Sequence, residues 1–373
     1  MGSNTVQLGD VVLLEDSKRE PLSSRQRASR KGLYPYYGAQ GVVDHLNDFT
    51  YKGTYLLVAE DGENLRSRKQ PIARIVSGEF RVNNHAHVLR GTDKCDIRIL
   101  AWLLNEMNIS AYVTGAAQPK LSQKNLLFIE LELPTTDNQR AILRLLNPIS
   151  EKIRLNQRTN DYLAEMCDTV FAERFGGIGD NGVLSDVADI TMGQSPSGKS
   201  YNEDGNGTVF YQGRGEFGWR FPTQRLFTTE PKRMAAEGDV LMSVRAPVGD
   251  LNVAYEDCCI GCGLVAIHSQ HPSYCLCLMR SLGKKLDAYN GEGTVFGSIN
   301  GKALKGLEIG LPDANAIEAF EAFSRPIDQQ IRANVAEERS LAALRDALLP
   351  KLMSGEIDVS QIELPAPQTQ KLA

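Results

Sequence analysis

Apolar residues recur at intervals of three and four over two long stretches of the chain. The first stretch covers residues 142–170 and the second covers 320–348. This spacing places the apolar side chains on one face of an α-helix, so we predict a helix in each stretch. With their caps the helices hold about 40 residues each, and at about 1.5 Å per residue they are about 60 Å long. Ordinary globular helices are shorter than this.

Both stretches carry signals for the ends of helices. Residues 136–137 (Thr-Asp) and 312–313 (Pro-Asp) precede them, while Gly176-Gly177 and Gly355 follow them. Two apolar stripes of equal length favour pairing of the helices with each other as an antiparallel coiled coil. The alternative is that each helix packs separately on its own domain.

The segments before each long helix predict short strands. Runs rich in apolar and β-branched residues alternate with Gly, Pro, Asn and Asp. The expected strands are 54–59, 72–76, 240–244 and 263–267, and the expected helices are 97–105 and 274–286. The fold class is therefore α+β, with mainly antiparallel or mixed strands.

The chain also repeats itself. Residues 111–175 align with 289–353 without a gap, at an offset of 178 positions, and the loop at 36–41 resembles the loop at 211–215. We interpret the chain as a tandem duplication whose copies have a divergent globular part and a better-matched C-terminal segment. The predicted segments are a globular part at 1–134, a helical segment at 135–178, a second globular part at 179–312, a second helical segment at 313–357 and a tail at 358–373.

Composition and charge exclude several classes of protein. Hydrophobic residues make up 42% and charged residues 23% of the 373 residues, as in an ordinary soluble globular protein. No run approaches the ~18 uncharged apolar residues of a membrane span, and residues 1–4 lack the start of a signal peptide. Seven cysteines are few for this length, so we expect a cytoplasmic protein with reduced thiols and no membrane contact. The net charge of −5 excludes a globally basic nucleic-acid coat but allows a local basic face.

One loop has the glycine-rich pattern of a phosphate-binding loop. It covers residues 193–200, with Lys199 where a lysine would reach the outer phosphates. The next residues, 201–207, cannot readily start the amphipathic helix that such a loop needs. A nucleotide-binding enzyme is therefore the weaker alternative, and we interpret the loop as a polar connection. The sequence contains neither a nucleophile elbow nor a zinc-protease helix, so we expect no catalytic residue in this chain.

Four cysteines in the second globular part have spacings that could suit zinc, with two histidines between them. They are Cys259, Cys262, Cys275 and Cys277, with His268 and His271. The repeat opposes a zinc site, because Cys275 and Cys277 align with the apolar residues Ile97 and Ile99. We interpret the cysteines as small buried residues and expect no metal.

Basic residues gather in two clusters of the first globular part. Residues 17–31 hold six basic side chains against one acid, and Arg66, Arg68 and Lys69 form a second cluster. A local stripe of Lys and Arg suits phosphate contacts, whereas base reading needs Arg, Lys, Gln or Asn in loops. The residues that we predict to contact DNA on this basis are Arg25, Arg27, Lys31, Gln40, His45, Arg66, Arg68, Lys69, Asn83, Asn84, Gln212, Arg214, Trp219, Arg220 and Arg245. For each of them the alternative is a solvated surface residue.

The ordered set of motifs resembles the specificity subunits of type I restriction-modification systems. Residues 34–38 and 190–197 resemble the start of that family's target recognition domains. Residues 121–126 and 299–304, each followed by a Leu-Pro pair, resemble its junction with the helix, and 350–357 resembles its helix ending. The residues of these motifs that join the predicted DNA contacts are Tyr37, Lys124, Asn300 and Lys302.

The resemblance implies a division of labour between subunits. Each recognition domain would read one half of a split double-stranded DNA site, and the paired helices would fix the gap between the halves. The helices would also dock two methyltransferase subunits, which bind S-adenosylmethionine and methylate adenine by base flipping. Restriction subunits would add ATP-driven translocation and cleavage, so this chain would need no cofactor of its own.

Two points qualify the resemblance. The family often has Glu-Gln after the Leu-Pro pair, where this chain has Asn138-Gln139 and Ala316-Ile317. A stand-alone protein that binds a bipartite DNA site has the same sequence features, and co-purification with a methyltransferase subunit would distinguish the two.

An asparagine interrupts the apolar stripe at the same place in each long helix. Antiparallel pairing would set Asn156 against Asn334 and Leu163 near Ile327. A buried asparagine pair disfavours slipped registers, because a slip leaves each amide against hydrocarbon. Leucine at both positions is therefore expected to raise thermal stability and to loosen the register. The alternative is that both asparagines face solvent or a docked partner.

Overall fold

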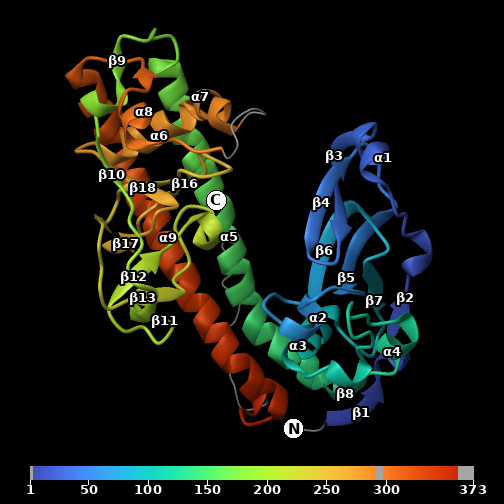
Figure 1. Ribbon diagram of the computed structural model, residues 1–373. Helices are drawn as coiled ribbons and strands as arrows, with labels where there is room; N and C mark the ends of the chain where they lie inside the picture. The colour runs from blue at the N-terminus through green and yellow to red at the C-terminus, as the bar shows by residue number, and fades with distance from the viewer. Residues whose placement is uncertain (1–2, 291–296, 360–373) are drawn as a thin grey trace, which may run out of the picture. The chain divides into compact units, whose positions relative to one another are not determined.

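The computed structural model describes residues 3–290 and 297–359. The chain forms two units, and the boundary between them falls within both long helices (Figure 1). Unit 1 contains the described residues up to Lys152 and those from Leu341 onward, while unit 2 contains Ile153–Ser340. Each unit therefore combines one globular part with a piece of each long helix.

The two long helices predicted from the apolar spacing are confirmed. Helix α5 spans Thr136–Phe175 with 40 residues, and helix α9 spans Ala314–Ser354 with 41. The described helices include none that is both long enough and apolar enough to cross a membrane.

Unit 1 is built on a six-stranded sheet. Its strands lie in the order β2 (Val12–Leu14), β7 (Ala86–Gly91), β5 (Tyr51–Ala59), β6 (Ala73–Val82), β3 (Lys31–Gly38) and β4 (Gly41–Leu46). Neighbouring strands are antiparallel except β3 and β6, which are parallel. Strand β1 (Ser3–Gln7) pairs with β8 (Glu130–Pro134), the strand that leads into α5. The short helices are α1 (Ser24–Ala28), α2 (Asn64–Ser67), α3 (Ile97–Glu106) and α4 (Gln123–Leu127).

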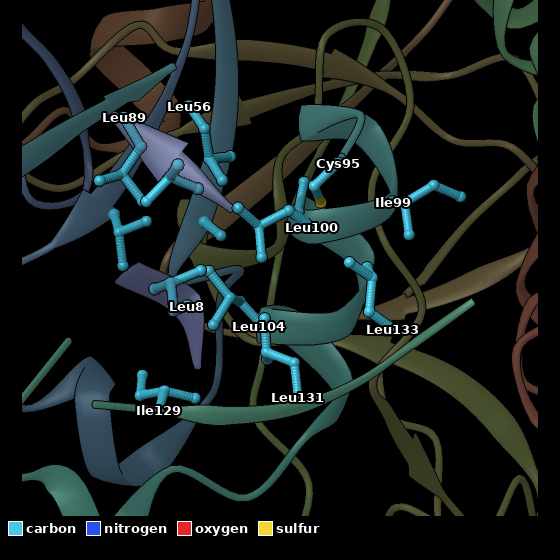
Figure 2. Close-up of a cluster of buried hydrophobic side chains, with 14 of the residues drawn as sticks. Leu8, Leu56, Leu89, Cys95, Ile99, Leu100, Leu104, Ile129, Leu131 and Leu133 are labelled. Carbon is cyan, nitrogen blue, oxygen red and sulfur yellow. The ribbon is translucent and has the colours of Figure 1, made fainter. Parts of the chain in front are cut away.

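Apolar side chains from α3 and the sheet form the main core of unit 1. Figure 2 shows Leu100 and Leu104 of α3 close to Leu8, Leu56 and Leu89. Burying a leucine side chain stabilises a fold by roughly 1.5–3 kcal/mol, so this cluster is a large part of the stability of the unit. The unit's pieces of α5 and α9 join the same core, through the side chains Ile142, Leu146, Leu349 and Leu352.

Unit 2 is built on two larger sheets. The first has the order β10 (Asp189–Met192), β18 (Leu264–His268), β15 (Val240–Ser243) and β16 (Leu251–Val253). The second has the order β11 (Tyr201–Asn202), β13 (Leu226–Thr228), β12 (Thr208–Tyr211), β17 (Cys258–Ile260) and β14 (Met234–Ala235). The remaining elements are the paired strands β9 (Gly182–Val183) and β19 (Glu308–Ile309) and the helices α6 (Pro272–Ser281), α7 (Gly283–Asp287) and α8 (Gly301–Lys305). The single helix expected at 274–286 is wrong, because Leu282 leaves the helical conformation between α6 and α7.

The two units contain the same order of strand pairings. The antiparallel pair β1–β8 of unit 1 corresponds to β9–β19 of unit 2, and β2–β7–β5 corresponds to β10–β18–β15. The parallel pair β3–β6 corresponds to β12–β17. In both units the last strand of this series leads into a long helix.

Within unit 2, α5 and α9 pack together in opposite directions. The rings of Phe171 and Phe320 are 5.6 Å apart, and Leu163 packs in one apolar cluster with Ile327 and Ile331. Residues nearer the start of α5 therefore meet residues nearer the end of α9. The sequence predicts Leu163 near Ile327, and both side chains pack against this one cluster.

Asn156 and Asn334 also meet in unit 2, and both are buried. Asn156 Nδ2 lies 3.5 Å from the backbone oxygen of Asn334 and donates to Glu337 at 2.7 Å. Asn334 Nδ2 donates to Asn160 Oδ1 at 2.7 Å. The predicted meeting of Asn156 with Asn334 is therefore confirmed, and Asn160, only 2% exposed, belongs to the same polar cluster.

We expect Asn334→Leu to lower the stability of the protein, in contrast to the expectation from the sequence. The substitution leaves Asn160 Oδ1 buried without its donor, which costs about 1–3 kcal/mol. Urea unfolding followed by circular dichroism would measure the change. Ala333→Leu, at an exposed position of α9, is the control for adding a leucine. A higher stability of Asn334→Leu would mean that apolar burial outweighs the lost hydrogen bond.

Candidate nucleic-acid interface

A cleft of about 620 Å³ lies in unit 1, where three connecting segments approach one another. These are the turn between β3 and β4, the segment after β5 and the turn between β6 and β7. Four residues predicted to contact DNA line it, namely Arg27, Gln40, Asn83 and Asn84. Sequence positions about 40 apart are thus brought to one surface, and amide side chains of this kind suit the edges of bases.

Two glycines allow the β3–β4 turn to approach its neighbours closely. A Cβ on Gly41, which has a φ of +133°, would lie 2.7 Å from the guanidinium of Arg74. A Cβ on Gly38 would lie 2.8 Å from Val43 and 3.0 Å from Asn83 Nδ2. At Gly41 a larger residue would strain the backbone because of the positive φ, whereas the neighbours of either Cβ are side-chain ends that can shift.

The basic stripe at 17–31 is largely neutralised by acids from other parts of unit 1. Asp44 of β4 receives Arg27 at 3.1 Å and Lys31 at 2.5 Å. The hydrogen bond from Lys31, with those from the His45 backbone and Arg27, lowers the pKa of Asp44 to about 2. Arg25 is exposed, and within the described residues no acidic group lies at ion-pair distance from it. Most of the six cations of the stripe are therefore paired with acids, and their contact with DNA stays a prediction.

Two members of the second basic cluster donate hydrogen bonds to backbone oxygens of the same unit, and of these Arg66 is exposed while Arg68 is half-buried. Arg66 donates to the backbone oxygens of Ala116 and Gly115 at 2.8 and 2.5 Å. Arg68 donates to the backbone oxygens of Leu104 and Asn105, and burial lowers the pKa of Arg68. A DNA phosphate at Arg66 or Arg68 would compete with these backbone contacts, and the predicted DNA contact of the cluster stays a prediction. Lys69 is exposed.

The remaining predicted residues of unit 1 are dispersed. Tyr37 is half-buried, with its ring edge against Phe80. His45 is exposed, but it lies on strand β4 and not in the loop that was expected. Lys124 is exposed on α4, where its ammonium lies 6.0 Å from the ring centroid of Phe128.

A buried cluster of charged side chains supports the cleft. His87 Nδ1 lies 2.7 Å from Asp16, and His87 Nε2 lies 2.8 Å from the backbone oxygen of Leu121. Burial raises the pKa of Asp16, but the hydrogen bonds from His87 and the Val88 backbone outweigh it, so the pKa is lowered overall. Glu60 is paired with Arg19 at 2.6 Å.

Three side chains of this cluster are of types that can bind a metal ion, namely Asp16, Glu60 and His87. Arg19 already supplies positive charge to both acids, at 3.1 Å from Asp16 and 2.6 Å from Glu60, and Lys120 lies 3.3 Å from Glu60. With these cations in place, the cluster is satisfied as a hydrogen-bonded ion network, which favours a structural role.

In unit 2, the predicted residues Gln212 and Arg214 follow β12. Gln212 is exposed, and a Cβ on Gly261 would lie 2.9 Å from its Cα, so the glycine permits close approach of this segment to the end of β17. Arg214 forms an ion pair with Asp250. Arg245, Asn300 and Lys302 are exposed, and Asn300 also caps α8 by accepting from the Ala303 backbone at 2.9 Å.

Trp219 and Arg220 contact the long helices of unit 2. Arg220 is buried in an ion pair with Asp328 of α9, and burial lowers the pKa of Arg220. Trp219 is half-exposed and lines a cavity of about 480 Å³ together with Asp161 of α5 and Glu338 of α9. Both residues thus belong to the contact of the globular part with the long helices of unit 2.

Two other motifs take ordinary structural roles. The glycine-rich loop at 193–200 ends in a single turn and continues into strand β11, without the helix that follows a phosphate-binding loop. Cys259, Cys275 and Cys277 are buried as expected, but Cys262 is exposed, so the interpretation of all four cysteines as buried is wrong for this residue.

Asp61 and His85 line the cleft of unit 1 and were not among the predicted residues. Each lies in a turn that follows a strand, Asp61 before Gly62 and His85 directly after Asn83-Asn84. That turn signal was present in the sequence. The sequence did not show that Asp61 and His85 lie close together, because this proximity depends on how β5, β6 and β7 pair.

Comparison with known proteins gives a consistent result. Residues 2–165 match the type I restriction modification DNA specificity domain. A type I restriction enzyme specificity subunit from Methanocaldococcus jannaschii is 29% identical over 279 residues, which cover 68% of this chain and 66% of that protein. One from Haemophilus influenzae is 32% identical over 143 residues, covering 38% of this chain and 36% of that protein.

A solved structure has a related fold. The type I restriction-modification S subunit from M. genitalium aligns over 94% of this chain and 96% of its own, with 15% identity and a TM-score of 0.53. Residues 2–165 therefore carry a type I restriction modification DNA specificity domain, and the chain as a whole is similar to type I restriction enzyme specificity subunits.

Proposed function

We propose that this chain reads a bipartite double-stranded DNA site for a type I restriction-modification complex. Unit 1 and unit 2 each read one half, and the bases are distinguished by the different side chains on matching turns. The observation that carries the proposal is the repeated order of strand pairings, which sets Gln40 of unit 1 and Arg214 of unit 2 on corresponding turns. Two similar folds with different reading residues suit two different half-sites.

The segments at 1–134 and 179–312 would be the two target recognition domains of a tandem repeat. The segments at 135–178 and 313–357 would be helical spacers, and 358–373 would be a tail, of which only residues 358 and 359 lie within the described part. The bounds of α5 and α9 support this division. The contact of Phe171 with Phe320, and the shared cluster against which Leu163 and Ile327 pack, support an antiparallel coiled coil.

Partner subunits would perform the chemistry. Two methyltransferase subunits would supply S-adenosylmethionine and methylate adenine, and restriction subunits would use ATP. The exposed apolar residues Leu155, Tyr162 and Met166 repeat along the face of α5 that points away from its contact with α9, and they suit a docked protein. Leu344 of α9, at the position that matches Met166 in the repeat, is exposed as well, which fits two docking surfaces.

The two alternatives predict different behaviour. A stand-alone DNA-binding protein would bind a split site but would not co-purify with a methyltransferase subunit. A nucleotide-binding enzyme would depend on Lys199, but the 193–200 loop without a following helix does not favour it.

Mapping methylated adenines tests the proposal. The chain would be co-expressed with the methyltransferase subunit from the same genome in a host that lacks adenine methylation, and the modified sites would be read by single-molecule sequencing. We expect one bipartite motif with a fixed gap. Methylation without a common motif, or no complex at all, would contradict the proposed function.

Gln40→Ala should change the base preference in one half of this motif only. Gln40 is exposed on the turn at the cleft, so its loss removes one base contact without disturbing the core. The expected relaxation is roughly 5- to 150-fold at one position. Arg214→Ala is the matched variant in unit 2 and should affect only the other half. A change in both halves after either substitution would rule out separate reading.

Two charge variants should change sequence-independent binding in opposite directions. Arg25→Gln removes an exposed cation and should flatten the log–log salt dependence by about 0.9. Asp44→Asn releases Arg27 and Lys31 and should steepen it. Fluorescence anisotropy with random-sequence duplex DNA at several salt concentrations would measure both slopes. Arg140→Gln, on α5, is the control, and an effect as large as that of Arg25→Gln would contradict a local phosphate surface.

Tyr162→Ala should weaken binding of the methyltransferase subunit. The side chain is 62% exposed, so its loss leaves the fold intact but removes an aromatic contact of the size of an interface hot spot. A hot spot of about 2 kcal/mol corresponds to a roughly 30-fold higher Kd. Surface plasmon resonance with the immobilised chain would measure it. Met234→Ala, exposed on β14 away from the helices, should bind as the wild type does.

A further inference from the structure

The cleft of unit 1 contains a carboxylate that its basic and amide residues do not explain. Asp61 Oδ2 accepts a hydrogen bond from His85 Nδ1 at 2.7 Å, and both side chains line the cleft beside Gln40 and Asn83. Asp61 is 18% exposed and His85 is 47% exposed. Among the described residues, no hydrogen bond occupies Asp61 Oδ1. A carboxylate is repelled by nearby phosphates, so its presence on a DNA-facing surface calls for a specific hydrogen-bond donor.

The backbone on both sides of this pair is fixed. The Glu60 N–H donates to the backbone oxygen of His85 at 2.9 Å, and the Gly62 N–H donates to that of Pro119 at 3.1 Å. The His85 N–H donates to Asn83 Oδ1 at 2.8 Å. The carboxylate is therefore held in place before any ligand arrives, which reduces the entropy that binding would cost.

The buried ion network lies directly beneath. Glu60, which precedes Asp61, is paired with Arg19, and its backbone oxygen accepts from the Leu121 N–H at 2.7 Å. The Leu121 backbone oxygen in turn faces His87 Nε2 at 2.8 Å. The segment that carries Asp61 is thus tied to the core on its inner side, and the carboxylate is left on the outer side.

We propose that Asp61 is a specificity-determining residue, which accepts a hydrogen bond from the exocyclic amino group of one base in the half-site read by unit 1. The inference rests on the proposed function and adds the class of base to it. His85 is a positioning residue, because its Nδ1–H holds one carboxylate oxygen and leaves the other for the base. In the major groove only adenine and cytosine present an amino donor, at N6 and N4.

Rejection of the other two bases follows from the same geometry. Guanine O6 and thymine O4 are acceptors, so opposite Asp61 they would leave two acceptors facing each other without a proton. Unpaired polar groups in a dry interface are costly, and the two negative atoms repel each other as well. Asp61 therefore selects both by accepting from adenine or cytosine and by penalising guanine or thymine.

The test uses the complete complex with its methyltransferase subunits and duplexes that carry the mapped site. Asp61→Asn should abolish selection for A or C at one position of one half, other than the methylated adenine, because an amide both donates and accepts. The wild-type preference lost is roughly 5- to 150-fold. The control is Glu79→Gln, which should leave the motif unchanged. Glu79 lies in the same unit and is paired with Lys52, but it does not line the cleft. His85→Gln should give a smaller loss at the same position as Asp61→Asn.

A second measurement keeps the protein intact. Deleting the amino group from the DNA, with purine in place of adenine or 2-pyrimidinone in place of cytosine, should weaken wild-type binding at that position and have little effect on Asp61→Asn. The two analogues also decide between adenine and cytosine. Three results would show that the inference is wrong although the bipartite motif stands. The first is an unchanged motif for Asp61→Asn, and the second is an equal change of the motif by Glu79→Gln. The third is that no amino deletion in that half-site weakens DNA binding by the wild-type complex. If the wild-type complex has no bipartite motif, the proposed function itself fails.

Discussion

One short parallel strand contact organises the candidate interface of each unit. In unit 1, Tyr36 pairs with Arg81 and Tyr37 with Val82, so β3 and β6 end at the same edge of the sheet. The turns after these strands therefore leave the sheet together, which sets Gln40 beside Asn83. In unit 2, β12 and β17 are paired in the same way and bring the segments after Tyr211 and Ile260 together. An antiparallel pairing at this point would send the two turns to opposite edges.

Charge on the surface of unit 1 is controlled by pairing and not by composition. Asp44 holds Arg27 and Lys31, and hydrogen bonds from Lys31, the His45 backbone and Arg27 lower the pKa of Asp44. A surface with most cations paired binds DNA less tightly without regard to sequence, because fewer phosphate contacts are available. In the proposed function, recognition would then depend more on the turns at the cleft, where side chains could distinguish base edges. Weak sequence-independent binding combined with base contacts at the turns suits a protein that must discriminate its site from other DNA sequences.

The helical contact in unit 2 combines apolar and polar layers. Phe171, Phe175 and Phe320 form the apolar layer, and Asn156, Asn160 and Asn334 form the polar one. Ring packing supplies most of the free energy, since aromatic side chains bury large areas. The amides add little stability, but a helix shifted along its partner would leave them unpaired in an apolar layer. Arg220 with Asp328 ties the globular part to the same helix.

The sequence alone determined the long helices, the class of fold and the residues that face each other across them. Helical period and internal repeat are local or regular patterns, so they were sufficient to predict α5, α9 and the meeting of Asn156 with Asn334. The ion pairs and the cleft required the tertiary structure. Arg220 and Asp328 form an ion pair although they are 108 positions apart in the sequence. Asp61 and His85, which are 24 positions apart, form a hydrogen bond. Neither contact can be predicted from composition or from the spacing of residues. Strand register decides which charges meet, and register is set by the packing of the whole sheet.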